Sequence, residues 1–318
     1  MPEVLQPSML RLVSASFKRN TACVDGFHPR HVGMLGESLI CSLAKLFTIF
    51  EIRGAWPSTE EKVLTVLIPK QEGGLRPIAL SRSLYRVYAR ARCVKVREWA
   101  ASVRQHKVNN AKNRWVGDST WRNQVRIAIA RSQTSVFEAQ MYVKKAFDNV
   151  DRRQLLDIAK RNGYPLPELM TSLMAYFWPK HIVYDGVASE AIVPRRGIAA
   201  GSASATFKLT VLLLPALARM AIAEPEASIS LHVDDIGVTV FDRTRSNALS
   251  RFENILRVVN GEFAKLNLPL ARERGVVLAS SEELAVKANK IVGDIAATTG
   301  TQARRLAVDY IVGRPKAN

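Results

Sequence analysis

The sequence has few cysteines and nothing that arranges them into a site. Its 318 residues include three cysteines, Cys23, Cys41 and Cys93, which are too few and too scattered for a disulfide framework. Cys23 lies near His28 and His31 in the chain, but no second cysteine pair completes a zinc-binding set, so isolated residues are the better interpretation. We therefore expect a protein of a reducing compartment.

Targeting signals, long apolar runs, internal repeats and low-complexity segments are also lacking. The first residues have neither the charged nor the apolar block of a signal peptide. The longest apolar stretch, residues 209–223, is shorter than the roughly 20 residues that span a bilayer, and it contains Pro215 and Arg219. We expect a soluble intracellular protein without a membrane partner. The sequence does not distinguish nucleus from cytoplasm.

Acidic residues are outnumbered, because 28 Asp and Glu stand against 46 Lys and Arg, a formal net charge of +18. Such an excess indicates a polyanionic partner, most often nucleic acid, with a generally basic soluble protein or attraction to anionic membranes as the alternative. Hydrophobic residues make up 47% of the chain, which argues against global disorder. The length suits one large or two ordinary domains.

The positive charge is concentrated in one part of the chain. Residues 51–150 contain 19 basic and 8 acidic residues, whereas residues 201–300 contain 11 of each. In the first stretch, basic residues alternate with aromatic and aliphatic ones along a helix predicted from about residue 83 to 103. A solvated helix face would explain that helix by itself. Together with the neutral stretch, a basic surface beside a binding channel is the favoured interpretation.

Hydrophobic periodicity and turn signals predict an α+β protein dominated by helices. Strands at 63–68 and 76–80 are expected to pair through a turn at 73–74, and Asp185-Gly186 is expected to join strands at 181–184 and 191–193. Further strands are expected at 135–143, 228–232 and 236–241. Helices are expected at 8–20, 34–53, 83–103, 119–131, 206–222 and 244–266, and Asn149 or Asp151 is expected to cap a helix that runs through Asn162.

The adjacent acids Asp234 and Asp235 are the most informative pair in the sequence. They interrupt two apolar β-type runs and therefore lie at the turn of a predicted hairpin. Charge at this place is costly unless it is compensated. Mg²⁺ is the usual compensation, because it prefers carboxylate oxygen and leaves positions open for phosphate. An ordinary acidic turn is the alternative, since Asp is common in turns.

Five further segments form an ordered series with this hairpin. They are residues 67–80, 144–150, 197–202, 272–278 and 303–310, and residues 25–29 precede them as an additional match. With His232-Val233-Asp234-Asp235, which is similar to a Tyr-x-Asp-Asp box, the series resembles the motifs of reverse transcriptases, in particular those of non-LTR retrotransposons and group II introns. The resemblance covers about residues 20 to 312. Each motif alone is weak, and six in order are strong.

The resemblance implies a right-hand polymerase fold with helical-plus-hairpin fingers and a palm of antiparallel sheet backed by helices. Residues 1–56 would form an N-terminal helical extension, residues 57–134 the fingers and residues 135–318 the palm, with finger-like helices interleaved at 150–195. Because the sequence ends soon after the last palm hairpin, we expect the thumb to be missing or truncated.

The resemblance also implies RNA-directed DNA synthesis by nucleotidyl transfer with two Mg²⁺ ions. The expected partners are an RNA template, a primer nucleic acid and a dNTP, and Asp234 and Asp235 would hold the metal. The nucleotide-binding residues would be Lys70, Arg76, Phe147, Gly201 and Arg274. The cations at 70 and 76 would clamp the triphosphate, Phe147 would select the deoxy sugar, and the glycine would allow a close backbone approach.

Tyr142 stands where the family has the catalytic Asp of the first palm motif. Asp148 is expected to follow the strand, and Glu138 lies about 13 Å away along it, so neither replaces the missing acid. A tyrosine phenol, with a reference pKa of about 10, is a poor Mg²⁺ ligand at neutral pH. We therefore expect polymerisation to be abolished or reduced by several orders of magnitude.

Two other functions are open from the sequence. One is a non-enzymatic, RNA-binding pseudo-polymerase derived from a retroelement, which keeps the basic channel without the chemistry. The other is a viral RNA-dependent RNA polymerase, but Phe147 and its Ala-Phe-Asp context argue against it. Ala199-Ala200 in place of the family's Pro-Gln, and His232 in place of Tyr, agree in direction with a decayed active site.

Overall fold

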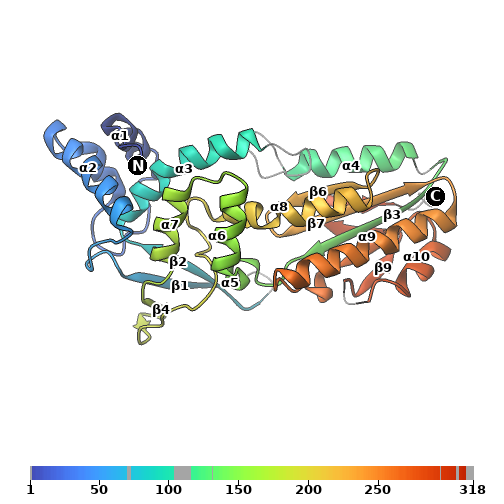
Figure 1. Ribbon diagram of the computed structural model, residues 1–318. Helices are drawn as coiled ribbons and strands as arrows, with labels where there is room; N and C mark the ends of the chain where they lie inside the picture. The colour runs from blue at the N-terminus through green and yellow to red at the C-terminus, as the bar shows by residue number, and fades with distance from the viewer. Residues whose placement is uncertain are drawn as a thin grey trace. The chain divides into compact units, whose positions relative to one another are not determined.

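The computed structural model describes residues 2–69, 73–103, 116–130, 132–293, 295–305 and 308–312. The chain forms two compact units, each assembled from two stretches of sequence (Figure 1). The first unit contains residues 1–102 and 150–208, and the second contains residues 103–149 and 209–318. The units are defined by packing alone, so the expected boundaries of extension, fingers and palm at residues 56 and 134 stay predictions.

The first unit combines helices with a four-stranded sheet of order β2-β1-β4-β5. The strands are β1 (Val63–Pro69), β2 (Leu75–Ser81), β4 (Lys180–Tyr184) and β5 (Val187–Ala188). The helices are α1 (Pro7–Ala15), the 3₁₀-helix η1 (Pro29–Met34), α2 (Glu37–Arg53), α3 (Ser83–Ser102), α6 (Arg152–Arg161) and α7 (Leu166–Ala175). Its core contains a cluster of aromatic residues, in which the Trp56 ring lies 5.3 Å from that of Tyr85 and 5.1 Å from that of Tyr88.

Both predicted hairpins of this unit are present, one of them in altered form. In the first, Val63 pairs with Ser81 at one end and Pro69 with Leu75 at the other. The turn at 185–186 joins β4 to β5, so the partner strand follows the turn directly. The strand expected at 191–193 is wrong, because Ile192 makes only an isolated bridge to Lys180.

The helix expected to start from a cap at Asn149 or Asp151 is α6, which begins at Arg152 and has Asp151 as its cap. The single turn α5 (Ala146–Asn149) precedes it. The Asp151 side chain accepts hydrogen bonds from the backbone N–H groups of Arg153 and Gln154, at 2.8 and 3.0 Å. This cap starts a new helix, because it satisfies amide donors that have no partner within the first turn.

The second unit is built on a five-stranded sheet of order β6-β7-β3-β8-β9. Its strands are β3 (Ser135–Tyr142), β6 (Ser228–His232), β7 (Asp235–Asp242), β8 (Val276–Ala279) and β9 (Thr298–Gly300), and a separate hairpin is formed by β10 (Gln302–Arg305) and β11 (Val308–Ile311). All pairings in the larger sheet are antiparallel except β8 with β9. The helices are α4 (Val116–Ala130), α5, most of α8 (Ala205–Ala223), α9 (Arg245–Lys265), the 3₁₀-helix η2 (Arg272–Arg274) and α10 (Glu282–Asn289).

Side chains of β3 alternate between the two faces of this sheet. On one face Phe137 stacks on Phe252 of α9, with ring centroids 5.0 Å apart. The opposite face is called the site face below. It carries the β3 residues Val136, Glu138, Gln140 and Tyr142, and their β7 partners Phe241, Thr239, Gly237 and Asp235.

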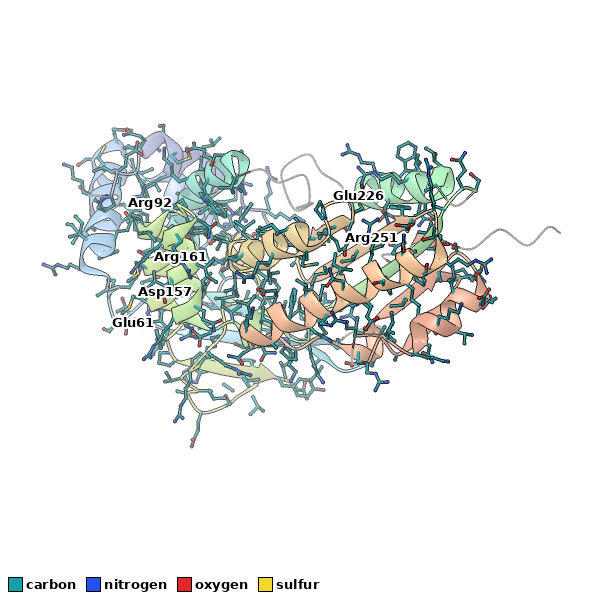
Figure 2. The ribbon with its side chains drawn as sticks, turned by 45° about the vertical axis from the view of Figure 1, so that its right-hand side comes forward. Glu61, Arg92, Asp157, Arg161, Glu226 and Arg251 are labelled. Atoms are coloured by element: carbon teal, nitrogen blue, oxygen red, sulfur yellow. The ribbon has the colours of Figure 1, made fainter. Side chains whose placement is uncertain are left out.

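An ion cluster ties α9 to the strands of the sheet. The Arg251 guanidinium lies 3.0 Å from Glu224, 3.0 Å from Glu226 and 3.3 Å from Asp242 (Figure 2). Glu224 and Glu226 precede β6, whereas Asp242 ends β7. One arginine in the second turn of α9 therefore joins this helix to the open end of the β6–β7 hairpin.

Of the described helices, α8 is the one that is long and apolar enough to cross a membrane. Yet 61% of its most apolar window is buried inside the protein, as in the core helix of a soluble protein. Pro215 lies within it. The compartment of the protein stays a prediction.

Candidate active site

The turn between β6 and β7 carries the two adjacent acids. His232 pairs with Asp235, so Val233 and Asp234 form a two-residue hairpin turn. Val233 has a φ of 58°, a conformation that costs a β-branched residue about 1–3 kcal/mol and that clusters at functional sites. Asp234 is half-buried and Asp235 is 6% exposed. The two carboxylates therefore occupy a strained turn at the end of the sheet.

Tyr142 lies directly opposite Asp235 in the β3–β7 register. Cross-strand partners of this kind have Cβ atoms about 4.5–5.5 Å apart on one face of a sheet. Backbone hydrogen bonds fix this end of β3 on both sides. The Tyr142 carbonyl accepts from the N–H of Ala271 at 2.8 Å, and the Val143 N–H donates to the carbonyl of Asp234 at 3.1 Å. Tyr142 is thus beside the acidic turn.

Arg274 covers the ring of Tyr142. Its guanidinium carbon lies 4.2 Å from the ring centroid, a cation–π contact that stabilises by about 0.5–1 kcal/mol at an exposed site. The η2 turn that carries Arg274 follows Ala271, the residue that bonds to the Tyr142 backbone. Four predicted site residues therefore lie close together in the second unit: Tyr142, Asp234, Asp235 and Arg274.

The donor atoms at this place do not fit a pair of Mg²⁺ ions. Among the residues that the structure describes, no group of three or more His, Cys, Asp and Glu side chains is arranged to hold a metal. Glu138 is held further along β3, where its Oε1 accepts from Asn123 and Gln140. Asp148 is exposed on α5. Asp234 and Asp235 supply two carboxylates, and Tyr142 supplies a phenol, which is a poor Mg²⁺ ligand. A third carboxylate, which two cations would need, is not present among these three residues.

Phe147, the residue predicted to lie under the sugar, is half-buried on α5. Lys145 precedes it with a φ of 47°. The Asn149 side chain donates to the carbonyl of Lys144 at 2.8 Å, which closes this turn. The left-handed residue and the amide contact explain why the strand ends abruptly and the short helix begins.

The other predicted nucleotide-binding residues belong to the first unit. Arg76 is exposed on β2, opposite Ile68. Gly201 has a φ of 93°, a conformation that glycine adopts freely. Lys70 lies outside the described residues. The proposed roles of these residues in nucleotide binding stay predictions.

Arg152 is a residue that sequence reasoning missed. It is buried and donates to four backbone carbonyls, those of Gly197, Tyr176, Pro194 and Arg196, at 2.7 to 3.1 Å. It thereby holds the segment that leads into the glycine-containing turn at 197–202. No sequence signal identifies it, because its four partners are backbone atoms distant in the chain.

A second missed feature is a buried ion pair between α7 and the first turn of α8. Lys208 Nζ lies 2.8 Å from Glu168 Oε1, which also accepts from Ser172 and Ser204. Burial acts to raise the pKa of the Glu168 carboxyl, but the Lys208 ammonium and the hydroxyl donors outweigh it and hold the pKa below its ordinary value. A lysine at the start of an apolar helix was the available sequence signal.

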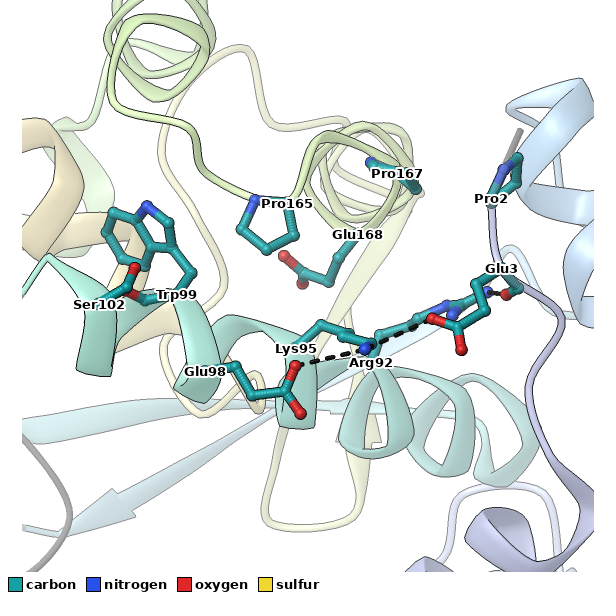
Figure 3. A pocket seen from close by; sticks show the side chains of 10 residues that line it. All are labelled: Pro2, Glu3, Arg92, Lys95, Glu98, Trp99, Ser102, Pro165, Pro167 and Glu168. Carbon is teal, nitrogen blue, oxygen red and sulfur yellow. Dashed lines mark hydrogen bonds and ion pairs between the residues drawn. The ribbon is translucent and has the colours of Figure 1, made fainter.

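A cavity of about 440 Å³ opens beside this pair in the first unit (Figure 3). Trp99, Pro165 and Glu168 line it, and the cations on its wall are already paired. Arg92 bonds to Glu51, and Lys95 lies 3.3 to 3.4 Å from Glu98 and Glu3. Of the predicted site residues that the structure describes, none lines this cavity.

Comparisons with known proteins support the fold and no more. No sequence model of a known family matches the chain, and no curated protein matches it. Among solved structures, an apo telomerase from Candida tropicalis, truncated from its C-terminal domain, is similar with a TM-score of 0.55 at 13% identity. The match covers 86% of this chain and 59% of the telomerase chain. The chain therefore has a reverse-transcriptase-like polymerase fold and spans about three fifths of that relative.

Proposed function

We propose that this chain is a reverse transcriptase domain of the non-LTR retrotransposon or group II intron type that binds RNA template and primer but is impaired in DNA synthesis. The observation that carries the proposal is the pairing of Tyr142 with Asp235 at the acidic turn. The fold supports a reverse-transcriptase-like domain, the motif order in the sequence supports the non-LTR or group II intron type, and the net charge of +18 supports a nucleic-acid partner.

Each residue of the site has a distinct part in this proposal. Asp234 and Asp235 supply the two carboxylates that remain at the hairpin turn. Tyr142 places a phenol beside the turn, where the resemblance implies a carboxylate. Arg274 holds the Tyr142 ring and adds a cation beside the turn. Arg76 is an exposed cation suited to phosphate.

Primer extension tests the catalytic part. The protein is compared with Tyr142→Asp on an RNA template with a DNA primer, dNTPs and Mg²⁺, and Tyr142→Asp combined with Asp234→Ala is the control. We expect extension by Tyr142→Asp to exceed that of the unchanged protein by at least about 10³-fold, because removing a catalytic ligand costs several kcal/mol of transition-state stabilisation. The control is expected to lose this gain.

The alternative is a non-enzymatic, RNA-binding pseudo-polymerase, favoured by the poor fit of the site to two cations. Binding of RNA without extension by either the unchanged protein or Tyr142→Asp would establish this alternative. Robust extension by the unchanged protein would contradict the impairment. Absence of RNA binding at low salt would contradict both functions, since either one requires the nucleic acid.

A further inference from the structure

Helix α4 lies on the site face of the second unit's sheet. Its Ile127 is buried and packs in one cluster with Val136 of β3 and Leu278 of β8. The Asn123 side chain donates to Glu138 at 3.0 Å and accepts from the Thr239 hydroxyl at 3.1 Å. Val136, Glu138 and Thr239 share the face that carries Tyr142 and Asp235.

The contacts also give the direction of α4. Asn123 is hydrogen-bonded to Glu138. Ile127 lies one helical turn after Asn123 and packs in one cluster with Val136, which lies two residues before Glu138 on β3. The helix therefore runs antiparallel to β3, and its N-terminal end points toward the Tyr142 end of the strand. Figure 1 shows α4 running along the strands of this sheet. The side of α4 that points away from the sheet thus forms the accessible surface over much of the site face.

The side of α4 that faces the sheet is largely polar apart from Ile127. Thr120 is buried there, and Asn123 bonds to the strands. The opposite side exposes Trp121 at 68% and Ile129 at 72%. At 100° per residue, Trp121, Arg122, Val125 and Ile129 share this outward side. A surface helix normally buries its apolar side, so an outward tryptophan indicates a partner.

Charge favours nucleic acid as that partner. Residues 103–131 contain seven basic residues and one acid, Asp118. Of the basic residues, Arg122 and Arg126 belong to the described part of α4, whereas Arg104, Lys107, Lys112, Arg114 and Arg131 lie outside the described residues. Arg122 is exposed beside Trp121. An exposed aromatic ring next to a cation is the combination that binds single strands, because every base has a face that stacks and every linkage has a charge.

We propose that the outward side of α4 binds single-stranded nucleic acid, with Trp121 as a stacking platform for a base and Arg122 as a phosphate contact. The proposal rests on the proposed function in requiring nucleic-acid binding, but it assigns that binding to a surface which none of the motifs includes. The strand would cross α4 above the sheet face that carries the acidic turn.

Fluorescence anisotropy with a labelled oligouridine RNA tests this surface in the full chain. We expect Trp121→Ala to weaken binding by about 5- to 150-fold, the range measured for loss of one stacked base, and Trp121→Phe to retain most of the affinity. The matched control is Ile222→Ala, which removes an equally exposed apolar side chain, 77% exposed on α8, and is expected to bind like the unchanged protein. Arg122→Gln is expected to lower the slope of log K against log salt by about 0.7.

Three outcomes would overturn the proposal, and they are distinguishable. Unchanged RNA affinity of Trp121→Ala, with tight binding by the unchanged protein, would remove α4 from the RNA-binding surface and leave the proposed function intact. No RNA binding by the unchanged protein at low salt would remove both. A dimer that becomes monomeric in Trp121→Ala without a change in RNA affinity, as measured by sedimentation, would make this side a contact between two copies of the chain.

Discussion

At the scale of single residues, a few positions decide both the chemistry and the packing. Tyr142 is the residue of β3 that pairs with Asp235. The side chain at this one position therefore determines whether a third carboxylate lies beside Asp234 and Asp235. Gly275, between η2 and β8, decides packing in a similar way. A Cβ atom on this glycine would lie 2.1 Å from the carbonyl oxygen of Ile295 and 2.9 Å from Cα of Ala296. The backbone segments can approach this closely only because the side chain is absent.

Gly275→Ala is therefore expected to destabilise the protein by more than about 2 kcal/mol, because backbone atoms cannot yield as a flexible side chain can. Gly261→Ala is the matched control. Gly261 lies inside α9 with nothing within 4 Å of the added atom, so alanine is expected to stabilise by about 0.5–1 kcal/mol through helix propensity. Urea unfolding measures both changes. Equal effects of the two substitutions would contradict the close approach at Gly275.

At the scale of elements, the segment at 25–29 acts as an anchor for α3. The Asp25 carboxylate accepts from the backbone N–H of Ser83 at 2.8 Å and from its hydroxyl at 3.0 Å. The same hydroxyl donates to the Phe27 carbonyl. The segment at 25–29, which the sequence singled out by its resemblance, thus has a structural role. Its Asp25 caps the N-terminus of α3, a helix rich in basic residues.

Loss of this cap is expected to cost about 1 kcal/mol in Asp25→Ala. Asp25→Asn keeps an acceptor oxygen and is expected to cost a few tenths of a kcal/mol at most. Thermal unfolding followed by circular dichroism at 222 nm measures the difference. A melting temperature of Asp25→Ala equal to that of the unchanged protein would show that the hydrogen bonds to Ser83 do not stabilise α3.

At the scale of the whole molecule, the stability of the first unit depends on a buried charge pair. Lys208 and Glu168 are both inaccessible to solvent, and two serine hydroxyls complete the hydrogen bonding of the carboxylate. Because the folded-state pKa of Glu168 is lowered, its stabilising contribution is present above the unfolded-state pKa and is lost as pH falls through the folded-state value.

Lys208→Met is expected to destabilise the protein by about 3–5 kcal/mol at pH 7, because it leaves a buried carboxylate without its cation. At lower pH the Glu168 carboxylate of the variant takes up a proton and loses its charge. The difference in free energy of unfolding between Lys208→Met and the unchanged protein is therefore expected to be smaller at pH 4 than at pH 7. The double variant Lys208→Met with Glu168→Gln is expected to recover part of the stability at pH 7. Urea unfolding at both pH values measures these differences. A loss that does not depend on pH would show that packing, and not charge, dominates the effect of Lys208→Met.

Local patterns predicted much of the secondary structure. The strands around the acidic turn and the first hairpin lie within a residue or two of their expected bounds, because alternation and turn residues act over a few positions. The strand expected at 191–193 was wrong, since its residues are apolar but the two-residue turn pairs β4 with Val187–Ala188 instead. Periodicity indicates which residues can form a strand and does not indicate which neighbour they meet.

The sequence by itself determined the charge excess, the order of the motifs and the absence of an aspartate at position 142. Each is a property of residue identity or of spacing along the chain. Only the tertiary structure decided that Tyr142 faces Asp235 and lies under Arg274, that Arg152 and Glu168 are held by partners from other segments, and that α4 turns its tryptophan away from the sheet. These facts depend on strand register and on contacts between residues that are distant in the chain. The packing of many side chains together determines both, and no local sequence pattern contains them.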